Sequence, residues 1–353
     1  MRSKTFYPQS CPNSPLLLGA LVTTGRRPSL SGLRHIRPLS VVVAAVLAVG
    51  ATAVLVGLDS GERHPGTSEA TEPVIGIRTF DVPRGITVTE DVVYDVEPNG
   101  TPLTLDVCTP PTNALPTGSP NLRPAVVSIH GGSWTRGDKS SDDWRVVCEW
   151  LASEGFVAYS LDYRLTPAAP FPAAIDDISH AVEWIRDTDN AARFGIDPAR
   201  IGAFGGSAGG NLAALLGTQG EGSLTMGSRV AAVAELSGPS DLRGASMTDD
   251  GASERLQKLA KRYLDCTNLD DCPRTTPASP VAQLDASDPP MFIGNSEKEF
   301  VPLKQATRFA DELERLGIPY ELVSRPGSVH SIGFLDADMR TRVAAFLHAS
   351  MGF

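Results

Sequence analysis

Residues 201–216, IGAFGGSAGGNLAALL, join a short apolar run to a helical pattern through a glycine-rich turn. The apolar run predicts a buried strand, and the residues from 211 onward predict a helix. Between them, GGSAG at 205–209 fits the pattern Gly-x-Ser-x-Gly. Small neighbours permit a sharp, strained turn that lifts the hydroxyl of Ser207 above the sheet. We therefore predict that Ser207 is a nucleophile. The alternative is a plain glycine loop or a phosphate-binding turn, although no lysine follows as in a P-loop.

Apolar runs alternate with helical patterns along the rest of the chain. This alternation predicts an α/β fold, with a mostly parallel, doubly wound sheet and helices on both faces. Three early runs alternate apolar and polar residues more strongly, which predicts an antiparallel edge. The polar stretch 243–282, with a short helix near 254–264, is expected to form a small lid. The predicted strands are 79–82, 91–94, 103–107, 125–129, 156–161, 201–204, 230–236, 291–293 and 320–323, and the predicted helices are 175–185, 211–216, 303–316 and 339–347.

A second glycine-rich loop, HGGSW at 130–134, comes directly after the predicted strand 125–129. Its glycines allow the backbone N–H groups of Gly131 and Gly132 to point into a pocket. Together with the N–H of Ala208, these groups are expected to hold a developing oxyanion. Trp134 is expected to wall the substrate pocket. A tight turn with a core tryptophan is the alternative interpretation of this loop.

The general base is found by elimination among six histidines. In open parallel sheets, reactive groups gather in the loops that follow the strands. Only His330 lies in such a loop late in the chain, where the order serine, acid, histidine requires it. We therefore predict that His330 takes the proton of Ser207. The other histidines lie in the N-terminal segment, a linker, the HGG loop or predicted helices: His35, His64, His130, His180 and His348.

The acid that orients His330 should follow the predicted strand 291–293. The stretch there, GNSEKEFVPL, offers Glu299 and Glu297, of which we favour Glu299. Its task would be to orient the imidazole and to stabilise the imidazolium. Three weaker candidates for this acid are Asp241, Asp285 and Asp288.

Five stretches carry a resemblance to a known superfamily. Residues from about 90 to 350 resemble the α/β-hydrolases, and within them the esterase/lipase branch with the HGG loop. That branch includes hormone-sensitive-lipase-like carboxylesterases, acetyl-xylan and feruloyl-type esterases, and kynurenine formamidases. In that branch the acid is usually an Asp in a stretch like HGxxDxxVP. This chain departs from the pattern, because it has Glu299 in place of the Asp and its spacing is one residue shorter. The stretches are HGGSW at 130–134, LDYRL at 161–165, GGSAGGN at 205–211, LSGPSDL at 236–242 and PPMFIGNSEKEFVPL at 289–303.

The resemblance implies a serine carboxylesterase or lipase that acts on a small-molecule ester through an acyl-enzyme, with no metal or cofactor. An amide hydrolase, either a formamidase or an exported peptidase, is the nearest alternative. A non-catalytic binding module on the same fold is another. Asp162 and Arg164 are expected to form a structural ion pair, and Asp176 and Asp177 are expected to be charges at a helix N-terminus.

Charged residues are distributed unevenly along the chain. Its net charge is −10, yet residues 1–58 hold six basic residues and no acid. The remainder therefore has 31 − 6 = 25 basic against 41 acidic residues. An acidic body argues against nucleic acid as a partner, because binding to phosphates needs clustered Lys and Arg.

Residues 40–58 form an uncharged apolar run of 19 residues, nearly long enough to span a bilayer as a helix. Arginines precede the run and acids follow it, which predicts that the body lies outside the cytoplasm. A signal anchor is the favoured interpretation. A cleaved signal peptide, with ATA at 51–53 as its small-residue site, and a buried core helix are the alternatives. The predicted division is a basic cytoplasmic tail (1–39), this segment, a linker (59–75) and an exported or membrane-anchored catalytic domain (76–353).

Four of the five cysteines follow the apolar run, and their even number permits two disulfides. Cys266 and Cys272 are close in a polar loop and are expected to pair, which leaves Cys108 for Cys148. Four buried free thiols are the alternative. The loop is a poor zinc site because no second Cys or His pair accompanies it, so no metal is expected.

Overall fold

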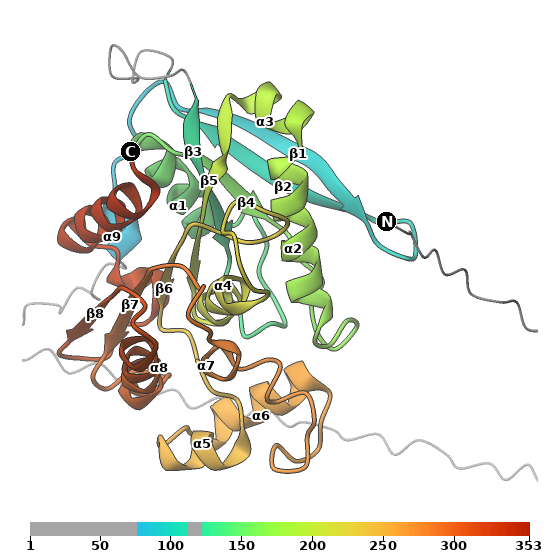
Figure 1. The fold of residues 1–353 in the computed structure, drawn as a ribbon, viewed down its shortest axis with the longest axis vertical. Helices are drawn as coiled ribbons and strands as arrows, with labels where there is room; N and C mark the ends of the chain where they lie inside the picture. The colour runs from blue at the N-terminus through green and yellow to red at the C-terminus, as the bar shows by residue number, and fades with distance from the viewer. Residues whose placement is uncertain (1–75, 112–121) are drawn as a thin grey trace, which may run out of the picture. The chain divides into compact units, whose positions relative to one another are not determined.

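The structure is a computed structural model that describes residues 76–111 and 122–353 (Figure 1). The predicted tail, apolar run and linker at 1–75 therefore lie outside the described residues. An eight-stranded sheet has the order β1-β2-β4-β3-β5-β6-β7-β8. The strands are β1 (Thr87–Val96), β2 (Pro102–Thr109), β3 (Arg123–Ile129), β4 (Val157–Leu161), β5 (Ile196–Gly206), β6 (Ala232–Leu236), β7 (Met291–Ser296) and β8 (Tyr320–Arg325).

The predicted α/β fold with an antiparallel edge is confirmed. β2 pairs antiparallel with β1 and with β4, and every other neighbouring pair is parallel. The central strands are buried on both faces, which is why their sequences are continuous apolar runs. The sequence of β1 alternates between apolar and polar residues because one of its faces meets solvent.

The strand predicted at 79–82 is wrong. Gly76–Thr79 is a 3-10 helix, η1, and the chain is irregular until β1 begins. Ile77 is fully buried there, and the guanidinium of Arg340 donates to the carbonyl of Gly76 at 3.1 Å. These distant contacts outweigh the local alternation on which the prediction rested.

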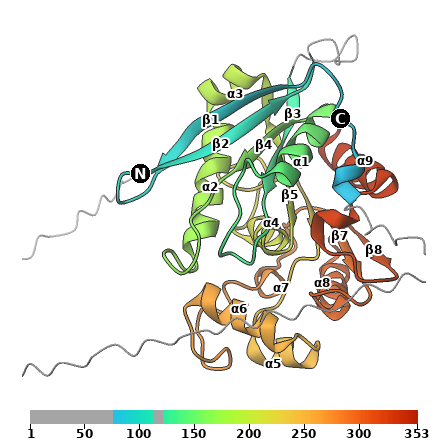
Figure 2. The ribbon, with the colours of Figure 1, turned by 180° about the vertical axis from the view of Figure 1, so that it is seen from behind.

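Helices cover both faces of the sheet. One apolar core packs α1 and α9 against it, and a second packs α2, α4 and α8 against the other face. Accordingly, α9 and α2 lie on opposite sides of the strands in Figure 1 and in the reverse view of Figure 2. The helices are α1 (Asp142–Ser153), α2 (Ala173–Arg186), α3 (Thr188–Phe194), α4 (Ala208–Thr218), α5 (Gly244–Asp249), α6 (Glu254–Leu264), α7 (Pro280–Gln283), α8 (Leu303–Leu316) and α9 (Ala337–Met351), with a short 3-10 helix η2 (Ser331–Phe334).

Helices α5, α6 and α7 form an excursion between β6 and β7 (Figure 1). This is the polar stretch expected as a small lid, and its main helix has the predicted limits 254–264. The Ser253 hydroxyl caps that helix by accepting from the N–H of Leu256 at 3.2 Å. Its four buried residues pack its inner face against the body: Leu256, Ala260, Tyr263 and Leu264.

Both predicted disulfides are present. Cys108–Cys148 joins β2 to α1, and Cys266–Cys272 closes the loop after α6. Across residues 76–111 and 122–353, none of the helices combines the length and the apolar character that a membrane crossing requires.

Candidate active site

Ser207 stands alone between β5 and α4 in a strained turn. Its φ is 59° and its ψ is −120°, a left-handed backbone that non-glycine residues rarely adopt. Its N–H donates to the carbonyl of Leu236 at the end of β6, at 2.8 Å. A Cβ on Gly209 would lie 2.0 Å from the carbonyl oxygen of Ile129, so only glycine lets α4 start this close to β3. The tight turn predicted around Ser207 is therefore present.

His330, in the loop after β8, reaches the nucleophile candidate. Its Nε2 lies 2.9 Å from the Oγ of Ser207, from which it accepts a hydrogen bond. Its side chain is 30% exposed, so it remains accessible to a bound molecule. The ring of Phe300 stands edge-on to the imidazole with a centroid distance of 5.9 Å. The structure thus brings together the two side chains that the chain order predicted to meet.

Glu299 occupies the position of the acid. Its Oε2 accepts from the Nδ1 of His330, and because a carboxylate can only accept, Nδ1 carries the proton. Its side chain is fully buried. Its Oε1 accepts from the backbone N–H of Ser296 at 2.9 Å. Glu297, the alternative acid, is exposed and makes no hydrogen bond to His330. Of the two glutamates, Glu299, which we favoured, is therefore the one that contacts His330.

The HGG loop passes beside the serine. A Cβ on Gly131 would lie 3.4 Å from the Cβ of Ser207 and 2.8 Å from the carbonyl oxygen of Gly206. Within the described residues, the N–H groups of Gly131 and Gly132 donate to no protein acceptor. Ala208 is the first residue of α4, whose N-terminus carries positive potential. The three predicted oxyanion donors are therefore adjacent to the nucleophile.

His130 holds this loop and is not a second base. It is 1% exposed, its ring stacks on Tyr163 at 4.3 Å, and its Nδ1 donates to the carbonyl of Gly131 at 2.8 Å. The hydroxyl of Tyr163 donates to the carbonyl of His130 at 2.8 Å. Burial lowers the pKa of His130, which keeps the imidazole neutral.

A cavity of about 640 Å³ opens onto Ser207 and His330. Trp134, predicted to wall it, is not among its lining residues and is 2% exposed. Its indole instead stacks on Tyr263 at 4.5 Å, because the left-handed backbone at this residue turns the side chain into the core. Trp144, on α1, lines the cavity in its place. The alternative interpretation of Trp134, a core tryptophan on a tight turn, is the correct one.

Residues 112–313, more than half of the chain, match the family model described as BD-FAE. The chain belongs to the BD-FAE family. Its motifs and fold place it in the HGG-motif esterase branch of the α/β-hydrolases, as the resemblance predicted.

Curated relatives of this BD-FAE chain include two mycobacterial proteins. Esterase LipQ of Mycobacterium tuberculosis is 28% identical over 267 residues, which cover 73% of this chain and 60% of that protein. Carboxylesterase NlhH of the same species is 33% identical over 216 residues, which cover 59% of this chain and 66% of that protein. The chain thus spans less than two thirds of the length of these relatives, and only 25% of arylacetamide deacetylase of Bos taurus.

Solved structures share the fold of this BD-FAE chain. A Pyrobaculum calidifontis esterase is 25% identical with a TM-score of 0.61, and the match covers 74% of this chain and 85% of that one. A thermophilic esterase from the Planctomycetes species Thermogutta terrifontis is 25% identical with a TM-score of 0.58, covering 76% and 94%.

The BD-FAE chain has a further residue at the site that sequence analysis missed. Ser237 is fully buried directly after β6, and its Oγ donates to Oε1 of Glu299 at 2.9 Å. The same Oγ accepts from the N–H of Ser331, next to the histidine, at 2.8 Å. The available signal was its place in LSGPSDL, immediately after a predicted strand, where the other site residues also lie.

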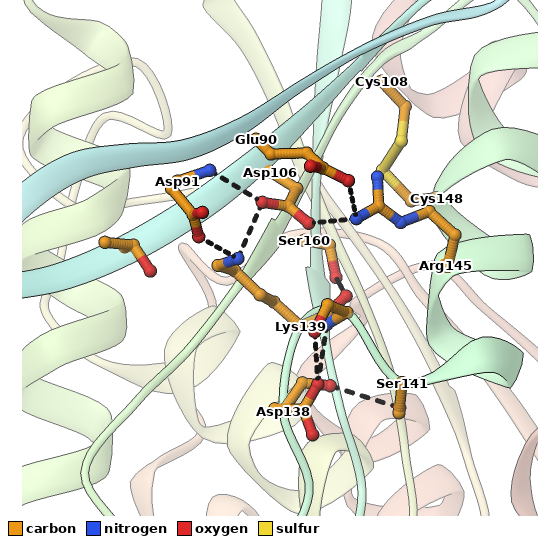
Figure 3. Close-up of polar contacts among 12 residues, drawn as sticks. Glu90, Asp91, Asp106, Cys108, Asp138, Lys139, Ser141, Arg145, Cys148 and Ser160 are labelled. Carbon is orange, nitrogen blue, oxygen red and sulfur yellow. Dashed lines mark hydrogen bonds and ion pairs between the residues drawn. A yellow bond between two sulfur atoms is a disulfide. The ribbon is translucent and has the colours of Figure 1, made fainter.

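The far end of the HGG loop is fastened by a buried ion cluster (Figure 3). Lys139 follows the loop, and its ammonium lies 2.8 Å from a carboxylate oxygen of Asp106 on β2. Figure 3 shows this carboxylate between Lys139 and Arg145, which approaches it from α1 at 2.7 Å. The N–H of Lys139 also donates to Asp162 at 2.8 Å. The loop is therefore anchored at both ends, by His130 and by Lys139.

Arg164 does not pair with Asp162, contrary to the expectation. Its guanidinium binds the buried carboxylate of Asp177 at 2.6 Å instead. Asp177 is therefore an ion-pair partner and not a free charge at a helix N-terminus, because the first turn of α2 faces LDYRL. In the described part of this BD-FAE chain, no three His, Cys, Asp or Glu side chains gather as metal ligands.

Proposed function

We propose that this chain is a serine hydrolase that cleaves carboxylic esters of small molecules through an acyl-enzyme. The observation that carries the proposal is the hydrogen-bonded series Glu299, His330, Ser207, in which each group touches the next. A serine hydroxyl is a weak nucleophile until an adjacent base takes its proton, and this series supplies that base and its orienting acid.

In the first half-reaction, His330 takes the hydroxyl proton while the Oγ of Ser207 attacks the ester carbonyl carbon. The resulting oxyanion is held by N–H groups of the HGG loop and of Ala208. The imidazolium then gives its proton to the leaving alcohol oxygen as the carbon–oxygen bond breaks, which leaves the acyl group on Ser207.

In the second half-reaction, water replaces the alcohol. His330 takes a proton from the water, the hydroxide attacks the acyl carbonyl, and the carboxylic acid departs as Ser207 regains its proton. Loss of one oxyanion donor typically costs about 2.7–4 kcal/mol of transition-state stabilisation. Glu299 stabilises the imidazolium in both halves without accepting the proton.

The names of the two mycobacterial relatives support an ester, whereas the name of arylacetamide deacetylase, which matches only 28% of this chain, denotes an amide. LipQ is named an esterase and NlhH a carboxylesterase. The Thermogutta terrifontis esterase has also been solved phosphonylated by sarin, the type of adduct that a reactive serine forms. A phosphonate reagent is therefore the appropriate probe for this chain.

The test combines labelling with turnover. The full chain should be labelled by a fluorophosphonate probe and should hydrolyse a series of p-nitrophenyl esters of increasing acyl length. Ser207→Ala should lose both activities, and Ser153→Ala, on α1, serves as the matched control. No labelling of the wild type would favour a binding module, and preference for aminoacyl p-nitroanilides over the esters would favour an amide hydrolase.

The two candidate acids give a matched comparison. Glu299→Gln should lower kcat by about 10⁴-fold, as replacing the acid of such a triad by an amide does when the histidine loses its proper tautomer. Glu297→Gln should leave kcat unchanged, because that side chain is exposed and the imidazole binds Glu299 instead. Equal losses in the two variants would remove Glu299 from the proposed triad.

We further propose that residues 40–58 deliver the chain to a membrane and leave the catalytic domain outside the cytoplasm. The apolar run with arginines before it supports this orientation. The pairing of all four described cysteines also supports it, because disulfides persist in oxidising compartments. Labelling of intact cells with a membrane-impermeant amine reagent tests the proposal, and protection of the chain would overturn it.

A further inference from the structure

Two arginines line the cavity that holds Ser207 and His330. They are Arg136 and Arg255, and both side chains are exposed to the cavity. Among the described residues, neither guanidinium has a carboxylate or another polar acceptor within hydrogen-bonding distance. Such a pair of cations beside a nucleophile is an arrangement that the proposed acyl transfer does not use.

A second cavity, of about 900 Å³ beside α8, shows the contrast. Its arginines are all paired: Arg243 with Asp241 and Arg308 with Asp250, each at 2.6 Å, and Arg315 with Glu312. The three arginines of that cavity are therefore neutralised by carboxylates, whereas the two arginines of the cavity at the nucleophile form no ion pair with the described residues.

Arg136 belongs to the oxyanion side of the cavity. A Cβ on Gly132 would lie 2.0 Å from the carbonyl oxygen of Arg136 and 3.2 Å from its Cγ, so the arginine stem runs along this glycine. Gly132 is one of the proposed oxyanion donors. A substrate whose carbonyl oxygen rests in that site therefore brings a nearby substituent within reach of Arg136.

Arg255 belongs to the histidine side. It is the second residue of α6, and its guanidinium carbon lies 5.4 Å from the ring centroid of Phe300. Phe300 in turn packs against His330. Since the histidine delivers its proton to the leaving alcohol, Arg255 stands on the side where that alcohol departs.

The one acidic residue in the cavity lining is already neutralised. Both carboxylate oxygens of Asp143 accept from the guanidinium of Arg78, at 2.6 and 2.8 Å. The lining therefore has a positive excess, although the whole chain has a net charge of −10. Because the overall charge repels anions at long range, short-range groups must do the recognition.

From this geometry we propose that the preferred substrate is an ester that also carries a carboxylate, bound by Arg136, Arg255 or both. The proposal rests on the ester hydrolysis proposed above. A planar guanidinium binds a carboxylate through two parallel N–H···O bonds, and charge-assisted bonds of this kind are about twice as strong as neutral ones. The carboxylate can belong to the acyl part or to the alcohol part of the ester.

Matched ester pairs test the proposal and distinguish the two sources. Monoethyl adipate against ethyl hexanoate places the charge on the acyl part, and 4-acetoxybenzoate against phenyl acetate places it on the alcohol. We expect the wild-type chain to have a higher kcat/KM for the charged member of at least one pair. Raising the ionic strength should lower the ratio of kcat/KM for the charged ester to that for the neutral ester, because salt screens exposed charges.

The arginine variants identify the binding group. Arg255→Gln or Arg136→Gln should lower the charged-to-neutral ratio of kcat/KM by about tenfold, the effect of losing one charge-assisted hydrogen bond. Lys258→Gln removes an exposed positive charge from the same helix outside the cavity lining, and it should leave the ratio unchanged. Arg255→Lys and Arg136→Lys should recover part of the preference, which separates lost charge from lost folding.

Two results would overturn the proposal while leaving ester hydrolysis intact. One is a wild-type chain that prefers the neutral ester in both pairs. The other is a preference for the charged ester that neither glutamine variant reduces. Absence of turnover with all four esters, combined with no fluorophosphonate labelling, would instead contradict the proposed function itself.

Discussion

The hydroxyl of Ser237 donates a hydrogen bond to Glu299, 2.9 Å from Oγ to Oε1, and so holds the carboxylate whose other oxygen faces His330. The same Oγ accepts from the N–H of Ser331 at 2.8 Å. One buried side chain therefore fixes both the acid and the loop that carries the base. Ser237 touches no substrate and is a positioning residue.

Removal of this hydroxyl should weaken turnover more than binding. We expect Ser237→Ala to lower kcat by about tenfold with little change in KM, since a hydrogen bond to a charged group contributes roughly 1.5–3 kcal/mol. Because Ser237 has a positive φ of 59°, Ser237→Gly is the companion variant that relieves the backbone and also lacks the hydroxyl. Steady-state kinetics of both variants measure the effect, and normal kcat in the glycine variant would contradict it.

A second buried glutamate lies under the site. Glu235 on β6 is 2% exposed, and its Oε2 accepts from the N–H of Gly238 at 2.7 Å. Burial, and to a smaller extent the charge of Glu299, raise its pKa from 4.5 to about 8. The folded chain therefore holds a proton on Glu235 that the unfolded chain releases above its ordinary pKa.

This proton makes the free energy of unfolding fall as pH rises from about 4.5 to about 8, because the folded state must keep the proton or bury a charge. Glu235→Gln, which cannot ionise, should be more stable than the wild type at pH 9, by on the order of 4 kcal/mol. The two proteins should be nearly equally stable at pH 4.5 or below. Denaturant titrations at both pH values measure the difference, and the same difference at each pH would contradict the assignment.

Asp106 stabilises the molecule through two cations. Its carboxylate is 1% exposed and contacts Lys139 and Arg145. Asp106→Ala should lower the free energy of unfolding by about 3–5 kcal/mol, because it leaves the buried ammonium of Lys139 with only the exposed carboxylate of Asp91 as a partner. Asp338→Ala, which breaks an exposed pair with Arg325, should cost at most about 1 kcal/mol. Urea unfolding of the two variants checks the contrast, and similar losses would refute it.

The two disulfides should contribute unequally to stability. Cys108–Cys148 closes a separation of 40 residues, and Cys266–Cys272 closes one of 6. Loss of chain entropy in the unfolded state gives about 4 kcal/mol for the first and about 2 kcal/mol for the second. Paired Cys→Ser variants compared by thermal unfolding should show this order. A larger loss for the short loop would show that native contacts around α6 dominate.

The sheet was predictable because its central strands are short apolar runs bounded by glycine and polar turns. Once those strands were placed, Ser207 and His330 followed from their positions after strands and from the chain order. Glu299 could be preferred over Glu297, but the choice required the fold, since only burial and contact with the imidazole distinguish them.

The remaining features depend on contacts between distant segments. Arg164 was assigned to Asp162 because the two are neighbours in sequence, whereas the turn of the chain presents it to Asp177. Trp134 was placed on the pocket wall because local sequence does not reveal a left-handed backbone. Ser237 was overlooked because its role exists only once β6, β7 and β8 lie side by side.

The excursion between β6 and β7 provides Arg255, while Ser207, Glu299 and His330 all come from loops at the ends of the strands. The substrate recognition proposed for Arg255 is thus encoded apart from the catalytic residues, whereas that proposed for Arg136 lies beside the HGG loop. Mutations in the α5–α7 segment can retune which molecules are accepted without disturbing the catalytic scaffold. Proteins with this arrangement can change their substrate preference while keeping the same catalytic residues.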